Sequence, residues 1–113
     1  MYNKNIFLYV YMQYSMRKLK EIREQLLKQN YVNSDVMKII KAISSLDTLF
    51  EKVPNNTKME SKEKAILLKK ETKKVKTLIL AYAKKNKTVP LELQQLNNFI
   101  DVLLDYIENT NFH

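Results

Sequence analysis

The sequence predicts an all-α protein folded as an antiparallel up-down four-helix bundle. Four segments carry apolar residues at the i, i+3, i+4 spacing of a single helix face. The connections between them are about three to five residues long, which favours antiparallel neighbours. Glycine is absent, so the positive-φ turns of tight β-hairpins lack their usual residue. We expect residues 1–113 to form one helical domain, because a chain of this length supports one core.

The first predicted helix spans residues 5–29. Its tyrosine-rich start also accepts a strand-like alternation, so a loosely packed N-terminal extension over residues 1–15 is a second interpretation of this segment. Met16 precedes three basic residues and would make an alternative translation start. The apolar stripe of this helix, interrupted at Ser15, consists of Leu8, Met12, Leu19, Ile22 and Leu26.

The second predicted helix begins near Asn33, Ser34 and Asp35, all good N-cap residues, and ends before Pro54. Its apolar face consists of Val36, Ile39, Ile40, Ile43, Leu46, Phe50 and Val53.

The third predicted helix starts at Thr57, since Thr57 and Glu60 have the spacing of a capping box, and it runs to Lys85 over about 43 Å. Its apolar positions are Ala65, Leu68, Val75, Ile79 and Tyr82, with Leu67, Leu78 and Leu80 widening the face and Thr72 filling a gap.

The fourth predicted helix opens at Thr88–Pro90, where proline presets φ for the first turn. After it, residues 109–113 form a tail that we expect to be mobile, or pinned only by Phe112. Asparagines in the left-handed conformation are expected to end the helices in place of glycine. These are Asn30, Asn55, Asn86 and Asn109. The apolar stripe of the fourth predicted helix consists of Leu93, Leu96, Ile100, Leu103 and Ile107, with Phe99 and Leu104 beside it.

The residue types that most enzymes and metal sites require are missing. There is no cysteine, and the sole histidine is His113, at the end of the chain. We therefore predict a protein that binds rather than catalyses, with no catalytic, cofactor-binding or metal-binding residues. The acidic pairs Asp47/Glu51 and Asp101/Asp105 are interpreted as exposed helix charges. The apolar run of residues 6–12 is too short to span a bilayer and does not resemble a secretory signal, so we expect a cytoplasmic protein.

The positive charge is concentrated in one segment. Residues 58–87 contain eleven lysines and three glutamates, whereas the rest of the chain balances nine basic residues with nine acidic ones. One interpretation is a solvated helix face, and the other is a docking surface for lipid headgroups, nucleic acid or an acidic protein. The absence of arginine from this segment argues against sequence-specific nucleic-acid recognition.

The layout of residues 17–113 resembles that of the cytosolic immunity proteins that protect lactic-acid bacteria from their own pediocin-like (class IIa) bacteriocins, the enterocin A immunity family. The matching features are a lead-in at Tyr31–Val36, an apolar helix through Leu46 and Phe50, and a long helix ending in Ala81–Asn86. A short connection at Lys87–Pro90 then leads into a last helix rich in acidic residues and glutamine. The tyrosine-rich leader and the shorter tail depart from many members of the family.

The resemblance implies a basic four-helix bundle that binds a toxin-occupied membrane component of the mannose phosphotransferase permease from the cytosolic side. It also allows peripheral contact with the anionic inner face of the membrane. In the family, the last two helices and the tail are associated with recognition. The partner-binding residues expected on this basis are Lys69, Lys70, Lys73, Lys74, Lys76, Lys84, Lys85, Lys87 and Phe112.

Two other functions are compatible with the sequence. The segment Ile43–Asp47 faintly resembles the Ser-Gln-Glu-Leu-Asp motif of the small helical phosphatases that act on sporulation response regulators, although only Leu46 and Asp47 match in type and order. Such a likeness implies a regulatory interaction module. The lysine-rich helix could also bind nucleic acid nonspecifically, with an affinity that falls steeply as salt rises.

Overall fold

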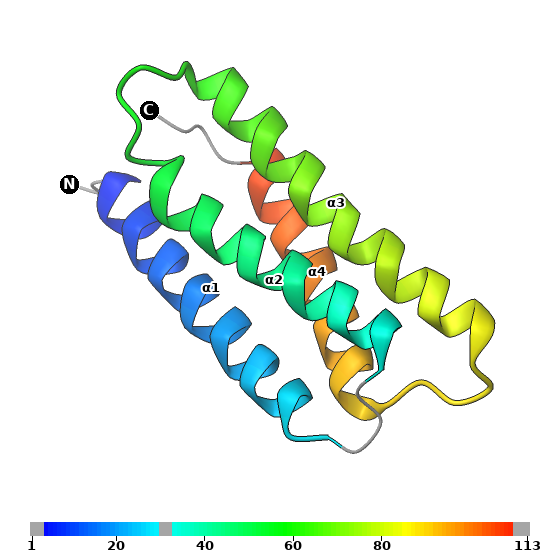
Figure 1. The fold of residues 1–113 in the computed structure, drawn as a ribbon. Helices are drawn as coiled ribbons and strands as arrows, with labels where there is room; N and C mark the ends of the chain where they lie inside the picture. Colours follow the sequence, from blue (N-terminus) through cyan, green and yellow to red (C-terminus); the bar gives the residue numbers. More distant parts are fainter. Residues whose placement is uncertain (1–3, 30–32, 110–113) are drawn as a thin grey trace.

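The computed structural model describes residues 4–29 and 33–109, with side chains from Gln13 onward. This part of the chain forms four helices, α1 (Lys4–Leu27), α2 (Ser34–Lys52), α3 (Ser61–Lys85) and α4 (Leu91–Glu108). The helices alternate in direction along one long bundle (Figure 1), which confirms the predicted all-α up-down architecture. Each helix packs against the next one in the chain, and α4 returns to touch α1 over a shorter stretch. Among these four helices, α3 contacts only α2 and α4.

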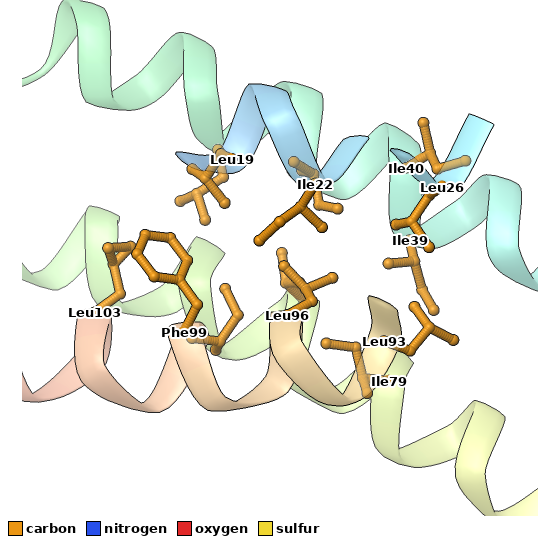
Figure 2. Close-up of a cluster of buried hydrophobic side chains, with 14 of the residues drawn as sticks. Leu19, Ile22, Leu26, Ile39, Ile40, Ile79, Leu93, Leu96, Phe99 and Leu103 are labelled. Atoms are coloured by element: carbon orange, nitrogen blue, oxygen red, sulfur yellow. The ribbon is translucent and has the colours of Figure 1, made fainter. Parts of the chain in front are cut away.

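The core is built from the apolar stripes that the sequence predicts. Figure 2 shows Leu19 and Ile22 of α1 pointing toward Leu96 and Phe99 of α4, which closes the bundle between its first and last helices. Thr72 is buried and fills the gap in the stripe of α3, as expected. Leu80 does not widen the core face, because its side chain is 47% exposed. The periodicity of the sequence therefore identified nearly all of the buried residues.

The helix starts agree with the predictions for α1 and α2 but differ for α3 and α4. α4 begins at Leu91 with Pro90 as its N-cap, so the proline precedes the first turn. Asn33 caps α2 by accepting a hydrogen bond from the Val36 amide at 3.0 Å. The capping box that the sequence predicts for α3 does not form, and the helix begins at Ser61 with Glu60 as its N-cap. The side chain of Asn56 instead accepts a hydrogen bond from the Lys58 amide at 2.9 Å. The connection from α2 to α3 therefore consists of turns. As a result, α3 begins about one helical turn later than the sequence predicts.

Asparagine side chains end the helices by a different means from the one expected. Asn86 and Asn109 are the C-caps of α3 and α4, but no described residue has a positive φ. Each side-chain amide instead donates to the backbone carbonyl four residues earlier, Asn86 to Tyr82 at 2.9 Å and Asn109 to Asp105 at 2.8 Å. Asn55 does the same beyond the end of α2. The Tyr82 and Asp105 carbonyls also accept the backbone amides of Asn86 and Asn109, so each side chain adds a second hydrogen bond at the helix end without the left-handed conformation.

The two ends of the chain are described only in part. α1 begins at Lys4, so a helix covers most of the segment that the sequence also allowed as an extension, and Ser15 is buried. Residues 1–3, the side chains of residues 4–12, Asn30 and the tail beyond Asn109 lie outside the described part.

Candidate functional site: the lysine-rich surface of α3

The charges of the sequence separate by helix. α3 carries nine lysines and only two glutamates, whereas α4 carries four acidic residues and no basic one. The two helices pack side by side. The positive charge of α3 is therefore compensated along the flank that faces α4.

Two of the predicted contact residues lie on the flank that faces α4 and are ion-paired there. Lys69 Nζ lies 2.6 Å from Glu108 Oε1, and the ammonium of Lys76 pairs with the carboxylate of Asp101. The hydrogen bond and the charge of Lys69 lower the pKa of Glu108, with a smaller contribution from Lys73. Lys69 and Lys76 thus join α3 to α4, and their charges are partly neutralised before any partner approaches.

The other flank of α3 faces α2 and carries fewer compensating charges. Lys85 Nζ lies 3.8 Å from Asp35 Oδ2, a long ion pair whose lysine side chain remains 67% exposed. Lys74 is exposed on the same side of the helix. Both lysines therefore remain accessible to a partner.

Lys64 does not belong to the surface at all. Its side chain is only 1% exposed, and Nζ donates a hydrogen bond to the Pro54 carbonyl at 2.9 Å. Of the nine lysines of α3, this one serves the fold. The simple charge count of the sequence therefore overstates the charge that the surface of α3 offers.

The side of α3 that points away from the bundle carries a single row of exposed residues, which we call the outward row. Its members are separated by steps of three or four residues, so they share one face of the helix. All of them are exposed, and none is acidic. In Figure 1, α3 runs along the outer edge of the bundle, and among the described helices it contacts only α2 and α4. The outward row consists of Lys62, Ile66, Lys70, Lys73, Thr77, Leu80 and Lys84.

The apolar members of the outward row were missed by reasoning from the sequence. Ile66 is 59% exposed and Leu80 is 47% exposed, and both lie among the lysines rather than in the core. Their spacing relative to Lys70, Lys73 and Lys84 was a signal that could have placed them there. The sequence indicated only the net positive charge of this segment, whereas the structure shows a mixed basic and apolar surface.

A groove lies beside the outward row, between the start of α3 and the end of α4. Its volume is about 540 Å³, and Ala65, Ile66 and Ile107 supply its apolar lining. Lys62, Lys69 and Glu108 place charges beside this lining. The groove extends the mixed basic and apolar character of the outward row onto the α4 side.

The two remaining predicted contact residues are not part of α3. Lys87 is exposed in the connection to α4, close in sequence to Lys84 and Lys85. Phe112 lies outside the described residues. The structure thus brings Lys70, Lys73 and Lys84 into one row and places Lys87 beyond the end of α3.

The acidic pairs show no arrangement suited to a metal ion. The described residues include no group of three or more histidine, cysteine or acidic side chains that could hold one. Asp101 and Asp105 are exposed, as expected, but Asp47 is half-buried and its Oδ1 atom has no hydrogen-bond partner. Burial raises the pKa of Asp47, while the positive charge of Arg23 opposes this shift. The expectation of an exposed charge was wrong for Asp47, because α1 covers this side of α2.

The segment that resembles a phosphatase motif is part of the contact between α1 and α2. Ile43 and Leu46 are buried in the core. The Ser44 hydroxyl donates to the Ile40 carbonyl at 3.1 Å and accepts from Arg23 at 3.2 Å. These side chains are engaged within the bundle, which favours a structural role for the segment.

None of the helices in the described residues combines the length and apolar character needed to cross a bilayer. Comparison of the chain with protein-family models, with curated proteins and with solved structures finds no match in any of the three.

Proposed function

We propose that this chain is an immunity protein of the pediocin-like bacteriocin class. In this role it acts inside the cell and binds a toxin-occupied mannose phosphotransferase permease from the cytosolic side, so that the lethal pore does not open. The protein acts by association and performs no chemistry. The observation that carries the proposal is the concentration of uncompensated lysines on α3 of an antiparallel four-helix bundle.

Two of the lysines expected from the sequence are left out of the proposed contact. Lys69 and Lys76 are already paired with α4, so their role is to hold α3 and α4 together. The lysines at the end of α3 and just beyond it are exposed, and they adjoin the connection into α4. The proposed contact residues are therefore Lys70, Lys73, Lys74, Lys84, Lys85 and Lys87, with Phe112 in the tail.

The test is a protection assay in living cells. The chain is expressed in a bacteriocin-sensitive strain, which is then challenged with a panel of class IIa bacteriocins. We expect survival to rise against one or a few members of the panel. Unchanged survival against every member would overturn the proposal.

Variants that remove lysines test whether the end of α3 makes the contact on which protection depends. Replacing Lys84, Lys85 and Lys87 together by glutamine should reduce protection, because three accessible positive charges are lost from the proposed contact. The matched control replaces the exposed residues Lys20, Lys28 and Lys41, which lie on and after α1 and on α2, and removes the same net charge. Equal protection by the two triple variants would show that the end of α3 is not the contact.

A further inference from the structure

The outward row of α3 combines positive charge with exposed apolar side chains. Four lysines share it with Ile66 and Leu80, and both aliphatic side chains are about half exposed. At 1.5 Å per residue, the row from Lys62 to Lys84 is about 33 Å long, and Ile66 and Leu80 are about 21 Å apart. A helix face that met only water would gain nothing from these two residues.

We propose that the outward row is a docking surface for anionic lipid headgroups, on which α3 lies parallel to the plane of the bilayer. This goes beyond the proposed function, because binding to lipid requires neither a toxin nor a permease. Its charged members are Lys62, Lys70, Lys73 and Lys84, and its apolar members are Ile66 and Leu80.

The arrangement of the outward row matches the layers of a membrane surface. Lysine ammonium groups at the end of flexible stems remain at the level of the phosphates, while aliphatic side chains between them reach the boundary with the acyl chains. A bilayer is flat on the scale of this helix, so a straight row on one rigid element can meet it along its whole length. Since α3 contacts only α2 and α4 among the described helices, nothing in the bundle has to move.

The acidic neighbours leave the row with an excess of positive charge. Asp101 and Glu108 of α4 are each paired with a lysine on the flank beside the row. On α3 itself, Glu63 is exposed next to Lys62, whereas Glu71 is half-buried. An anionic surface that approaches the row therefore meets four lysines, with one exposed glutamate beside them.

Nucleic acid is a poorer match for the same surface. Its interfaces are polar and strongly charged, so Ile66 and Leu80 would be desolvated against phosphates with no gain. The row also has no arginine or aromatic side chain to stack on bases or to contact them in a bidentate manner. The aliphatic residues distinguish lipid from nucleic acid here.

The test measures co-sedimentation of the full chain with vesicles of phosphatidylcholine alone and with vesicles containing about one-third phosphatidylglycerol. We expect binding to the anionic vesicles only, and weaker binding as salt rises. A lysine near an anionic membrane contributes roughly fivefold to partitioning, so Lys70→Gln with Lys73→Gln should weaken binding about thirtyfold. Ile66→Ser with Leu80→Ser should also weaken binding, but should leave its salt dependence in place.

Two matched controls keep the test specific. Lys28→Gln with Lys41→Gln removes the same charge away from the row, and Leu91→Ser with Val102→Ser removes two exposed apolar side chains of α4. Both controls should bind like the unmodified chain. Helical circular dichroism and the thermal midpoint should be unchanged in all four variants, because every substituted side chain is exposed.

Three outcomes would overturn the proposal. These are equal binding to neutral and anionic vesicles, equal losses in the row variants and their controls, and tighter binding to duplex DNA than to anionic vesicles at the same salt concentration. Each can occur whether or not the chain protects cells from a bacteriocin, so failure here is distinguishable from failure of the protection assay.

Discussion

The buried ammonium of Lys64 donates a hydrogen bond to the carbonyl oxygen of Pro54, with 2.9 Å between Nζ and O. Pro54 follows the last turn of α2, where unpaired carbonyls carry partial negative charge. The bond therefore joins the end of α2 to the first turn of α3 across the irregular connection between them. A lysine from the most basic segment of the chain thus holds two helices together.

Replacing Lys64 should destabilise the bundle. We expect Lys64→Ala to lower the free energy of unfolding by about 2–3 kcal/mol, because a bond to a charged group is lost and the buried methylenes leave a cavity. Urea unfolding followed by circular dichroism measures the change. The control, Lys62→Ala, alters an exposed lysine two residues away and should stay within about 0.5 kcal/mol. Similar losses in the two variants would contradict a structural role for Lys64.

The end of α3 provides a test of how asparagine stops a helix without glycine. Asn86 has φ of −122° and bonds through its side chain to the Tyr82 carbonyl. We expect Asn86→Gly to lower the free energy of unfolding by about 1 kcal/mol, since the side-chain bond is lost and glycine adds freedom to the unfolded chain. A left-handed cap would instead tolerate or favour glycine. An unchanged or higher stability, measured by urea unfolding, would therefore refute the side-chain mechanism.

The bundle should be more stable when the carboxyl of Asp47 is neutral than when it is ionised. Burial raises the pKa of Asp47 above 3.8, and Glu51 adds to the shift while Arg23 and Lys20 oppose it. A carboxyl whose pKa is higher in the folded state destabilises the fold when ionised, so stability rises as the pH falls through the raised pKa, until the unfolded chain is protonated too. We expect Asp47→Asn to be more stable than the unmodified chain at pH 7, with an advantage that shrinks on acidification.

The control for Asp47 is Glu24→Gln, which removes one exposed carboxylate from α1. Thermal unfolding of both variants across the acidic range measures the effect. If Asp47→Asn were less stable at pH 7 and equally stable in acid, the attraction between Asp47 and Arg23 would outweigh the cost of burial.

The pair Lys69–Glu108 should respond to pH in the opposite direction. Its hydrogen bond and charge lower the pKa of Glu108 from 4.5, so the stability it contributes is complete above pH 4.5 and is lost as the pH falls through the lowered pKa. Glu108→Gln should therefore cause a small loss at neutral pH that vanishes in acid and in high salt. A loss that persisted in high salt, in thermal unfolding experiments, would point to packing rather than charge.

Some features of the site could be predicted from the sequence and others could not. The net charge of residues 58–87 follows directly from their composition, and it marks α3 as the unusual helix. The division of its lysines into paired, buried and free ones does not, because that depends on which helix covers each flank. Lys69 and Lys76 form ion pairs with residues about 25 to 40 positions later in the chain, and no local sequence pattern predicts such pairs.

The sequence by itself determined the helices and their buried faces. A period of 3.6 residues places Leu93, Leu96, Ile100 and Leu103 on one side of α4 wherever that helix lies, and burying such stripes favours a bundle. Only the tertiary structure decided what the helix flanks do. It buried Lys64, covered Asp47 with α1 and left Ile66 and Leu80 outside, because exposure at a flank depends on where the neighbouring helix passes. The lysine-rich segment is basic by composition, but its exposed row of mixed basic and apolar residues results from helix packing.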